Sequence, residues 1–122
     1  MIPTINLEHG DESALLTYLG DLEAHFEERE SDVLAYVPED RRFERLQREA
    51  RALLVEYPEP AKRPKLFGVP VGVKDIFHVD GFVTRAGSEV PAELLQVAEA
   101  ESVRRLNSMP CSTVGVEVSL VW

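Results

Sequence analysis

The chain has 122 residues, of which 44% are apolar and 29% are charged, and its net charge is −9. This length suits one small globular domain, and the acidity argues against nucleic-acid binding, which leaves a basic footprint. The charge is uneven, because residues 1–60 carry fifteen acids and six arginines while residues 61–122 carry seven charges of each sign. The two halves are therefore expected to have different surroundings.

The single cysteine, Cys111, excludes an intrachain disulfide. The first residues do not resemble a secretory signal, and no stretch approaches the ~20 apolar residues that cross a bilayer. These features predict a cytoplasmic protein that does not contact a membrane.

The acidic half predicts two amphipathic helices. Asp11 is a suitable N-cap for the first helix. Pro38 suits the first turn of the second helix, which Pro58 and Pro60 end. Apolar residues recur in each helix at helical spacing: Leu15, Leu19, Leu22, Phe26 and Val33 in the first, and Phe43, Leu46, Ala50, Leu53 and Tyr57 in the second.

The second half has an α/β pattern. A proline-rich linker at residues 58–65 precedes an apolar run at 66–77, whose β-branched residues predict a buried strand. A third helix is expected over residues 91–107, and the alternating valines from 114 to 120 predict a second strand. The expected fold class is therefore α/β, with two N-terminal helices ahead of a strand, a helix and a further strand.

Lys74 is the first candidate for chemistry. It follows a nearly all-apolar strand, where loss of water favours the neutral amine, and a neutral amine can act as a base. The alternative is a lysine at the strand end whose ammonium reaches solvent. The residues alone favour this alternative, because such positions mark functional sites only in some proteins.

Several motif elements follow one another in the stretch 66–88: Leu66, Gly68, Val69, Pro70, Val73, Lys74 and Asp75, and then Thr84, Gly87 and Ser88. In this order they resemble the amidase signature hydrolases. The N-terminal region of that family typically reads Leu-x-Gly-Val-Pro-x-x-Val-Lys-Asp, followed further along by Thr-x-x-Gly-Ser. The resemblance extends from the first predicted helix to Leu106.

The resemblance implies a mixed sheet covered by helices. Residues 1–122 would form a partial amidase-like domain, with an acidic helical segment at 1–60 and the beginning of the α/β core at 61–122. The implied reaction is hydrolysis of a carboxylic amide by a serine nucleophile and a relay serine, without a metal or organic cofactor. Lys74 would occupy the base position. Because Val73 and Ile76 should anchor the backbone in the core, its amine is then expected to point into the molecule, or into a pocket left open by missing segments.

Two residues near Lys74 have more than one interpretation. Asp75 is expected either to tune the charge of Lys74 or to cap the turn that follows it. Ser88 is expected either to donate a hydrogen bond near the site or to act as the N-cap of the helix region at Pro91.

The family's serines belong to a later Gly-Gly-Ser-Ser-Gly-Gly run, which these 122 residues do not contain. From Asn107 onward the sequence also departs from the family's usual continuation, so the tail is expected to be a truncated or frame-altered end. With an incomplete Ser-Ser-Lys triad, the chain is expected to be inactive alone, and a small-molecule amide would be the substrate of a complete version.

A different hypothesis is a non-catalytic module, or pseudoenzyme fragment, whose acidic helices pair with another chain. The apolar run at residues 69–77 needs cover that the later helices of a complete version would supply, so self-association through this uncovered surface is also expected.

Three weaker candidates remain. His78 and Asp80 form a His-x-Asp pair without a third metal ligand at a recognisable spacing, which favours a structural role. Cys111 has no histidine placed beside it, which favours an incidental thiol over a nucleophile. The arginines between residues 41 and 51 lie among glutamates, which favours a solvated, salt-bridged helix face over a phosphate site.

Overall fold

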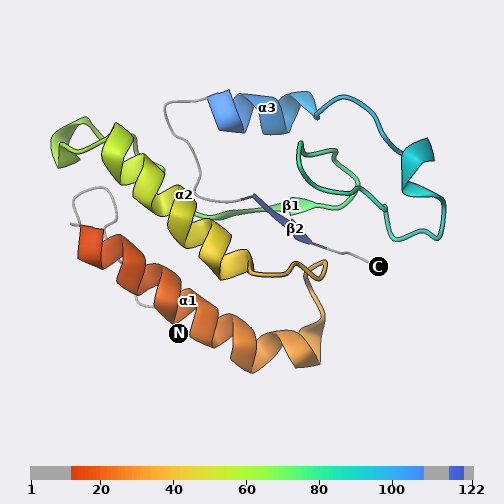
Figure 1. Ribbon diagram of the computed structural model, residues 1–122, viewed down its shortest axis with the longest axis horizontal. Helices are drawn as coiled ribbons and strands as arrows, with labels where there is room; N and C mark the ends of the chain where they lie inside the picture. The colour runs from red at the N-terminus through yellow and green to blue at the C-terminus, as the bar shows by residue number, and fades with distance from the viewer. Residues whose placement is uncertain (1–11, 109–115, 120–122) are drawn as a thin grey trace.

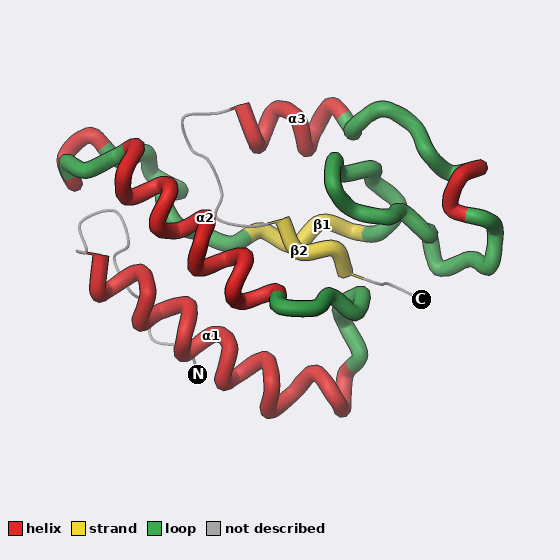
Figure 2. Tube along the Cα trace, viewed as in Figure 1, coloured by secondary structure: helices red, strands yellow, loops and turns green. Residues whose placement is uncertain are grey.

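The computed structural model describes residues 12–108 and 116–119, and the two strands lie between α1 and α3 (Figures 1 and 2). None of the described helices is long and apolar enough to cross a membrane. In chain order the elements are α1 (Glu12–Val33), α2 (Arg42–Glu56), a 3₁₀ helix (Pro60–Lys62), β1 (Val71–Lys74), a 3₁₀ helix (Ala92–Leu94), α3 (Glu101–Ser108) and β2 (Val116–Ser119).

The larger core lies between α1 and α2, which pack through the apolar stripes that the sequence predicted. Phe67 closes this core from the segment that follows the helices. Val33 is the exception in the first stripe, because its side chain is exposed in the last turn of α1. The buried members are Leu15, Leu19, Phe43, Leu46, Ala50, Leu53 and Phe67.

The start of α2 differs from the prediction. The helix begins at Arg42 and not at Pro38, because Arg41 has a left-handed conformation with φ of 59°. Side chains hold the preceding turn instead of helical hydrogen bonds: Arg42 donates to the carbonyl of Val37 and to the carboxylate of Glu39.

β1 is shorter than the predicted apolar run. Pro70 has no N–H to give to a ladder, and Gly68 has φ of +73°, so the strand begins only at Val71. It ends at Lys74 because the N–H groups of Ile76 and Phe77 turn back to the Lys74 carbonyl. The proline-rich linker that precedes this run contains the short 3₁₀ helix at Pro60–Lys62.

β1 pairs in parallel with β2, which falls inside the predicted run of alternating valines. Val71 lies opposite Val116, and Lys74 lies opposite Ser119. The described residues form this two-stranded sheet only, so a mixed-sheet core remains a prediction.

The third helix is also shorter than predicted. Residues 91–107 form the 3₁₀ helix and an irregular stretch before α3 begins at Glu101. The chain stays irregular up to Ala100 because the Ala100 N–H donates to the carbonyl of His78, across the loop, and not to a helical carbonyl. Val103 of α3 then packs with Val73 and Val79 in a second, smaller core.

Candidate functional site

Lys74 is the last residue of β1, and its side chain is exposed. The expectation that its amine points into the molecule is wrong, for a geometric reason. Successive side chains of a strand face opposite sides, and Val73 occupies the side that packs against Val79 and Val103. Lys74 must therefore face away from that core.

Asp75 joins the end of β1 to a distant part of the following loop. Its side chain is 2% exposed. Its Oδ1 accepts the Arg85 N–H at 3.0 Å, and its backbone carbonyl accepts the Ala86 N–H, also at 3.0 Å. Its Oδ2 is buried without a hydrogen-bond partner. Asp75 thus closes the loop 75–86, a longer-range contact than the turn cap considered from the sequence.

Ser88, which follows this loop in the chain, also holds the backbone of the loop in place. Its Oγ donates to the carbonyl of Arg85 at 2.8 Å, and its N–H donates to that carbonyl at 2.9 Å. This hydroxyl is not a helix cap, because the 3₁₀ helix begins later, at Ala92, and has no side-chain cap. Asp75 and Ser88 therefore meet at the backbone of Arg85 and not at the amine of Lys74.

His78 and Asp80 lie in this loop without forming a metal site. The Nδ1 of His78 is 3.1 Å from Oγ1 of Thr84, and its Nε2 is 3.9 Å from Oδ1 of Asp80. Across the described residues, no group of three or more histidines, cysteines, aspartates or glutamates is arranged to hold a metal ion. Cys111 lies outside the described residues.

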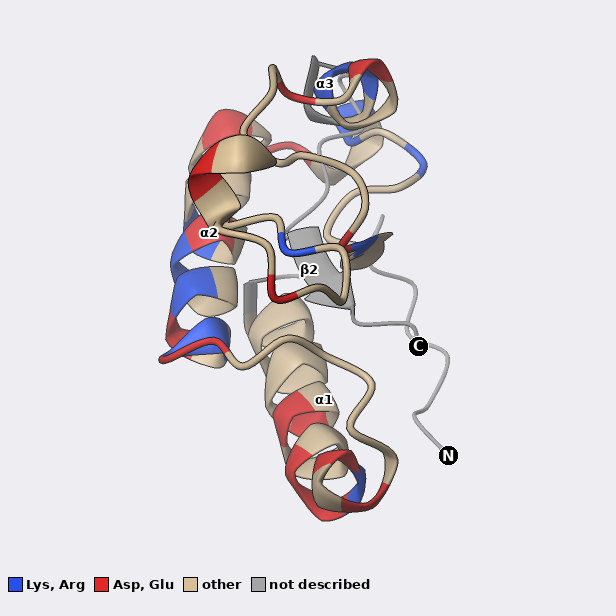
Figure 3. Cartoon of the chain, turned by 90° about the vertical axis from the view of Figure 1, so that its right-hand side faces the viewer, with Lys and Arg blue, Asp and Glu red and all other residues tan. Residues whose placement is uncertain are grey.

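Charged residues of both signs are spread along α2 (Figure 3), but the arginines of this helix do not all lie on a solvated face. Arg41, Arg48 and Arg51 are exposed, which fits the prediction. Arg42 is only 6% exposed and Arg45 only 15%, so these two are salt-bridged as predicted but are not on a solvated face.

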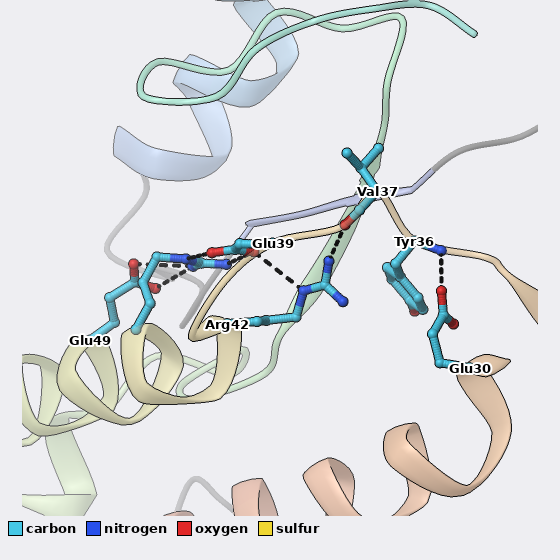
Figure 4. Close-up of polar contacts among 7 residues, drawn as sticks. Glu30, Tyr36, Val37, Glu39, Arg42 and Glu49 are labelled. Atoms are coloured by element: carbon cyan, nitrogen blue, oxygen red, sulfur yellow. Dashed lines mark hydrogen bonds and ion pairs between the residues drawn. The ribbon is translucent and has the colours of Figure 1, made fainter.

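Arg42 and Arg45 both bind Glu39, in the cluster of polar contacts drawn in Figure 4. The Nε of Arg42 donates to Glu39 at 3.2 Å, the Nε of Arg45 donates to it at 2.6 Å, and Nη1 of Arg45 donates to Glu49 at 3.2 Å. The guanidinium of Arg42 also lies over the rings of Phe26 and Tyr36. Arg42 lies four residues before Leu46, on the same face of the helix, and this spacing was the sequence signal for its burial.

Charge pairing sets the protonation of this cluster. Burial alone would raise the pKa of the Glu39 carboxyl, but the hydrogen bonds and positive charges of Arg45 and Arg42 together lower it below its ordinary value. Burial alone would likewise lower the pKa of Arg45, but Glu39 and Glu49 together raise it. The glutamate is therefore held as a carboxylate and the arginine as a cation.

Replacing Asp75 with alanine is expected to loosen the loop 75–86. The Arg85 N–H would lose its acceptor, so its hydrogen exchange should become faster by about tenfold, as the loss of one hydrogen bond of about 1.5 kcal/mol implies. Exchange measured by NMR tests this. The matched control is Asp80→Ala in the same loop, because the Asp80 side chain is 80% exposed. Equal exchange of Arg85 in both variants would contradict the assigned role of Asp75.

In a comparison with protein-family models, the amidase family matches residues 36–115, a range that includes Lys74, Asp75 and Ser88. No curated protein and no solved structure matches the chain. The matched range covers more than half of the 122 residues. The chain therefore belongs to the amidase family.

Proposed function

We propose that this chain is the base-bearing N-terminal portion of an amide hydrolase, and that the complete enzyme cleaves the C–N bond of a small-molecule carboxylic amide. The observation that carries the proposal is the family match over residues 36–115, which includes both the Lys74-Asp75 and the Gly87-Ser88 elements. Residues 1–60 would be its helical segment, and residues 61–122 the beginning of its α/β core.

In this proposal Lys74 is the base that takes a proton from a relay serine. Its exposed position at the end of β1 leaves the amine accessible to a serine supplied by another segment. A lysine accepts a proton only as a neutral amine, so that segment would also have to exclude water from around it. Asp75 and Ser88 would act as positioning residues, because both hold the loop that follows Lys74.

The purified chain is expected to show no serine-dependent turnover of simple aryl or alkyl amides. The Gly-Gly-Ser-Ser-Gly-Gly run is absent from these residues, and loss of even one oxyanion donor costs about 10²–10³-fold in rate. Release of amine would be measured with and without a serine-directed fluorophosphonate. Turnover that the reagent abolishes, and that Lys74→Ala loses but Lys65→Ala keeps, would contradict the proposed inactivity.

The proposal about the complete enzyme is tested by reading the coding DNA beyond codon 122 in all frames. A Gly-Gly-Ser-Ser-Gly-Gly run encoded there would support the proposal, and the protein extended through it should hydrolyse amides. Lys74→Ala in that extended protein should lower kcat by about 10² or more, because general-base catalysis contributes about 10²–10⁴-fold. An active extended protein that is insensitive to Lys74→Ala would remove Lys74 from its proposed role.

The non-catalytic interaction module stays as the second candidate. Large apolar side chains are exposed just after β1, with Ile76 at 55% and Phe77 at 45%. Another chain, or a second copy of this one, would cover such surface favourably. Self-association remains a prediction.

A further inference from the structure

A cavity of about 590 Å³ lies between the segment that leads into α2 and the loop 80–85. Cavities of about 300–1,000 Å³ commonly hold small molecules. One part of the wall is apolar and is formed by Val37, Pro38, Phe82 and Val83. Lys74 does not line this cavity, so an inference about it is independent of the proposed amide hydrolysis.

The polar floor of the cavity consists of four charged residues whose charges cancel: Glu39, Arg42, Arg45 and Glu49. Arg42 and Arg45 both donate to Glu39, and Arg45 also donates to Glu49. The guanidinium of Arg45 lies 5.2 Å from the centre of the Phe82 ring, which connects this floor to the loop 80–85. Two cations facing two anions leave the floor with no net charge to attract or repel a ligand.

Arg85 differs from these arginines. Its backbone is fixed on both sides, because its N–H donates to Asp75 and its carbonyl accepts from the N–H and Oγ of Ser88. Arg85 lines the cavity, and its guanidinium has no hydrogen-bonding or ionic partner among the described residues. The fold thus holds the backbone of a cationic side chain in place beside an apolar wall.

Asp80 is the remaining charged residue of the cavity. Its side chain is 80% exposed, and its Oδ1 lies 3.9 Å from Nε2 of His78. A carboxylate in this position repels a dianionic ligand more strongly than a monoanionic one, because the repulsion grows with the ligand's charge. It therefore favours a ligand with one negative charge over a dianion.

We propose that this cavity binds a small organic monocarboxylate. The ligand carboxylate would pair with the guanidinium of Arg85, whose planar donors match the two oxygens of a carboxylate. The apolar body of the ligand would lie against Phe82 and Val83. The two residues that fix the Arg85 backbone, Asp75 and Ser88, would set the position of this cation.

The test is an NMR titration of the full chain with benzoate. Saturable shifts of the Arg85, Phe82 and Val83 amides are expected. Benzamide, which has a similar shape but no charge, should bind at least tenfold more weakly, as should benzoate to Arg85→Gln, because a charge-assisted hydrogen bond is worth about tenfold or more in affinity. The matched control is Arg51→Gln, an exposed arginine of α2 that does not line the cavity, which should bind benzoate like the unchanged chain.

Arg85→Gln keeps the backbone groups that bind Asp75 and Ser88, so its spectrum should be unchanged away from the cavity. Benzoate binding that Arg85→Gln leaves unaltered would overturn the proposal, as would the absence of any saturable shift. An equal loss in Arg51→Gln would show general charge attraction in place of a site. Inorganic phosphate that binds as tightly as benzoate, with the same shifts, would overturn the assignment to monocarboxylates.

Discussion

Gly68→Ala is expected to lower the free energy of unfolding by about 2–5 kcal/mol. Gly68 has φ of +73°, a conformation that costs an L-residue about 1–2 kcal/mol. A Cβ at this position would lie 2.7 Å from Cδ1 of Leu15. Leu15 is 1% exposed and packed in the larger core, so its movement adds an overpacking cost of about 1–3 kcal/mol.

Alanine substitutions at two other glycines, measured by urea unfolding, separate the conformational cost from the packing cost. Gly87 has φ of +63° but nothing within 4 Å of a Cβ, so Gly87→Ala should cost only the conformational part. Gly20 lies inside α1 with the same open space, so Gly20→Ala should stabilise the chain, by up to about 1 kcal/mol. If Gly68→Ala costs no more than Gly87→Ala, Leu15 gives way easily and the packing argument is wrong.

The position of Gly68 connects the motif to the fold. The glycine of the Gly-Val-Pro sequence lies where the chain passes directly over α1, and Phe67 beside it is buried in the same core. The segment 66–70 therefore joins the helical half of the molecule to the start of β1. A residue that strains this crossing should also disturb the strand that ends at Lys74.

Periodicity predicted the helical half well, because it records which side chains face a core. The buried residues Leu15, Leu19, Phe43 and Leu46 all come from the predicted stripes. The ends of the elements were less predictable, since interactions between distant residues decide them. The bond from Ala100 to His78, for example, keeps residues before α3 out of a helix although their sequence allows one.

The candidate site was likewise predictable only in part. The order of motif residues identified Lys74, Asp75 and Ser88, but not their contacts. The apolar run suggested that Lys74 was buried, whereas strand alternation places it on the exposed side. Residues ten apart in a loop have no periodic signal, so the bond between Asp75 and Arg85 could not be predicted. The hydrogen bond between Arg45 and Glu39 could not be predicted either, because these residues lie on either side of the left-handed Arg41, where helical periodicity is interrupted.

Glu39→Gln is expected to lower the free energy of unfolding by about 2–3 kcal/mol at neutral pH. Removing one partner of a buried ion pair costs about 3–5 kcal/mol, and the value is smaller here because Glu39 is 19% exposed. The substitution would leave Arg42, 6% exposed, with a neutral partner in place of its carboxylate. Glu59→Gln is the matched control, since its ion pair with Lys62 is exposed on both sides and should contribute less than about 1 kcal/mol.

The pH dependence distinguishes this charge effect from a change in packing. Arg45 and Arg42 hold the pKa of Glu39 in the folded chain below the ordinary value of 4.5, which the unfolded chain keeps. The stabilisation by the carboxylate is therefore fully present above about pH 4.5 and is lost as the pH falls through the lowered pKa. Glutamine does not titrate, so the difference in unfolding free energy between the two proteins should shrink over this acidic range. A difference that stayed constant from neutral pH down to that range would mean that the shape of Glu39, and not its charge, holds Arg42 and Arg45 in place.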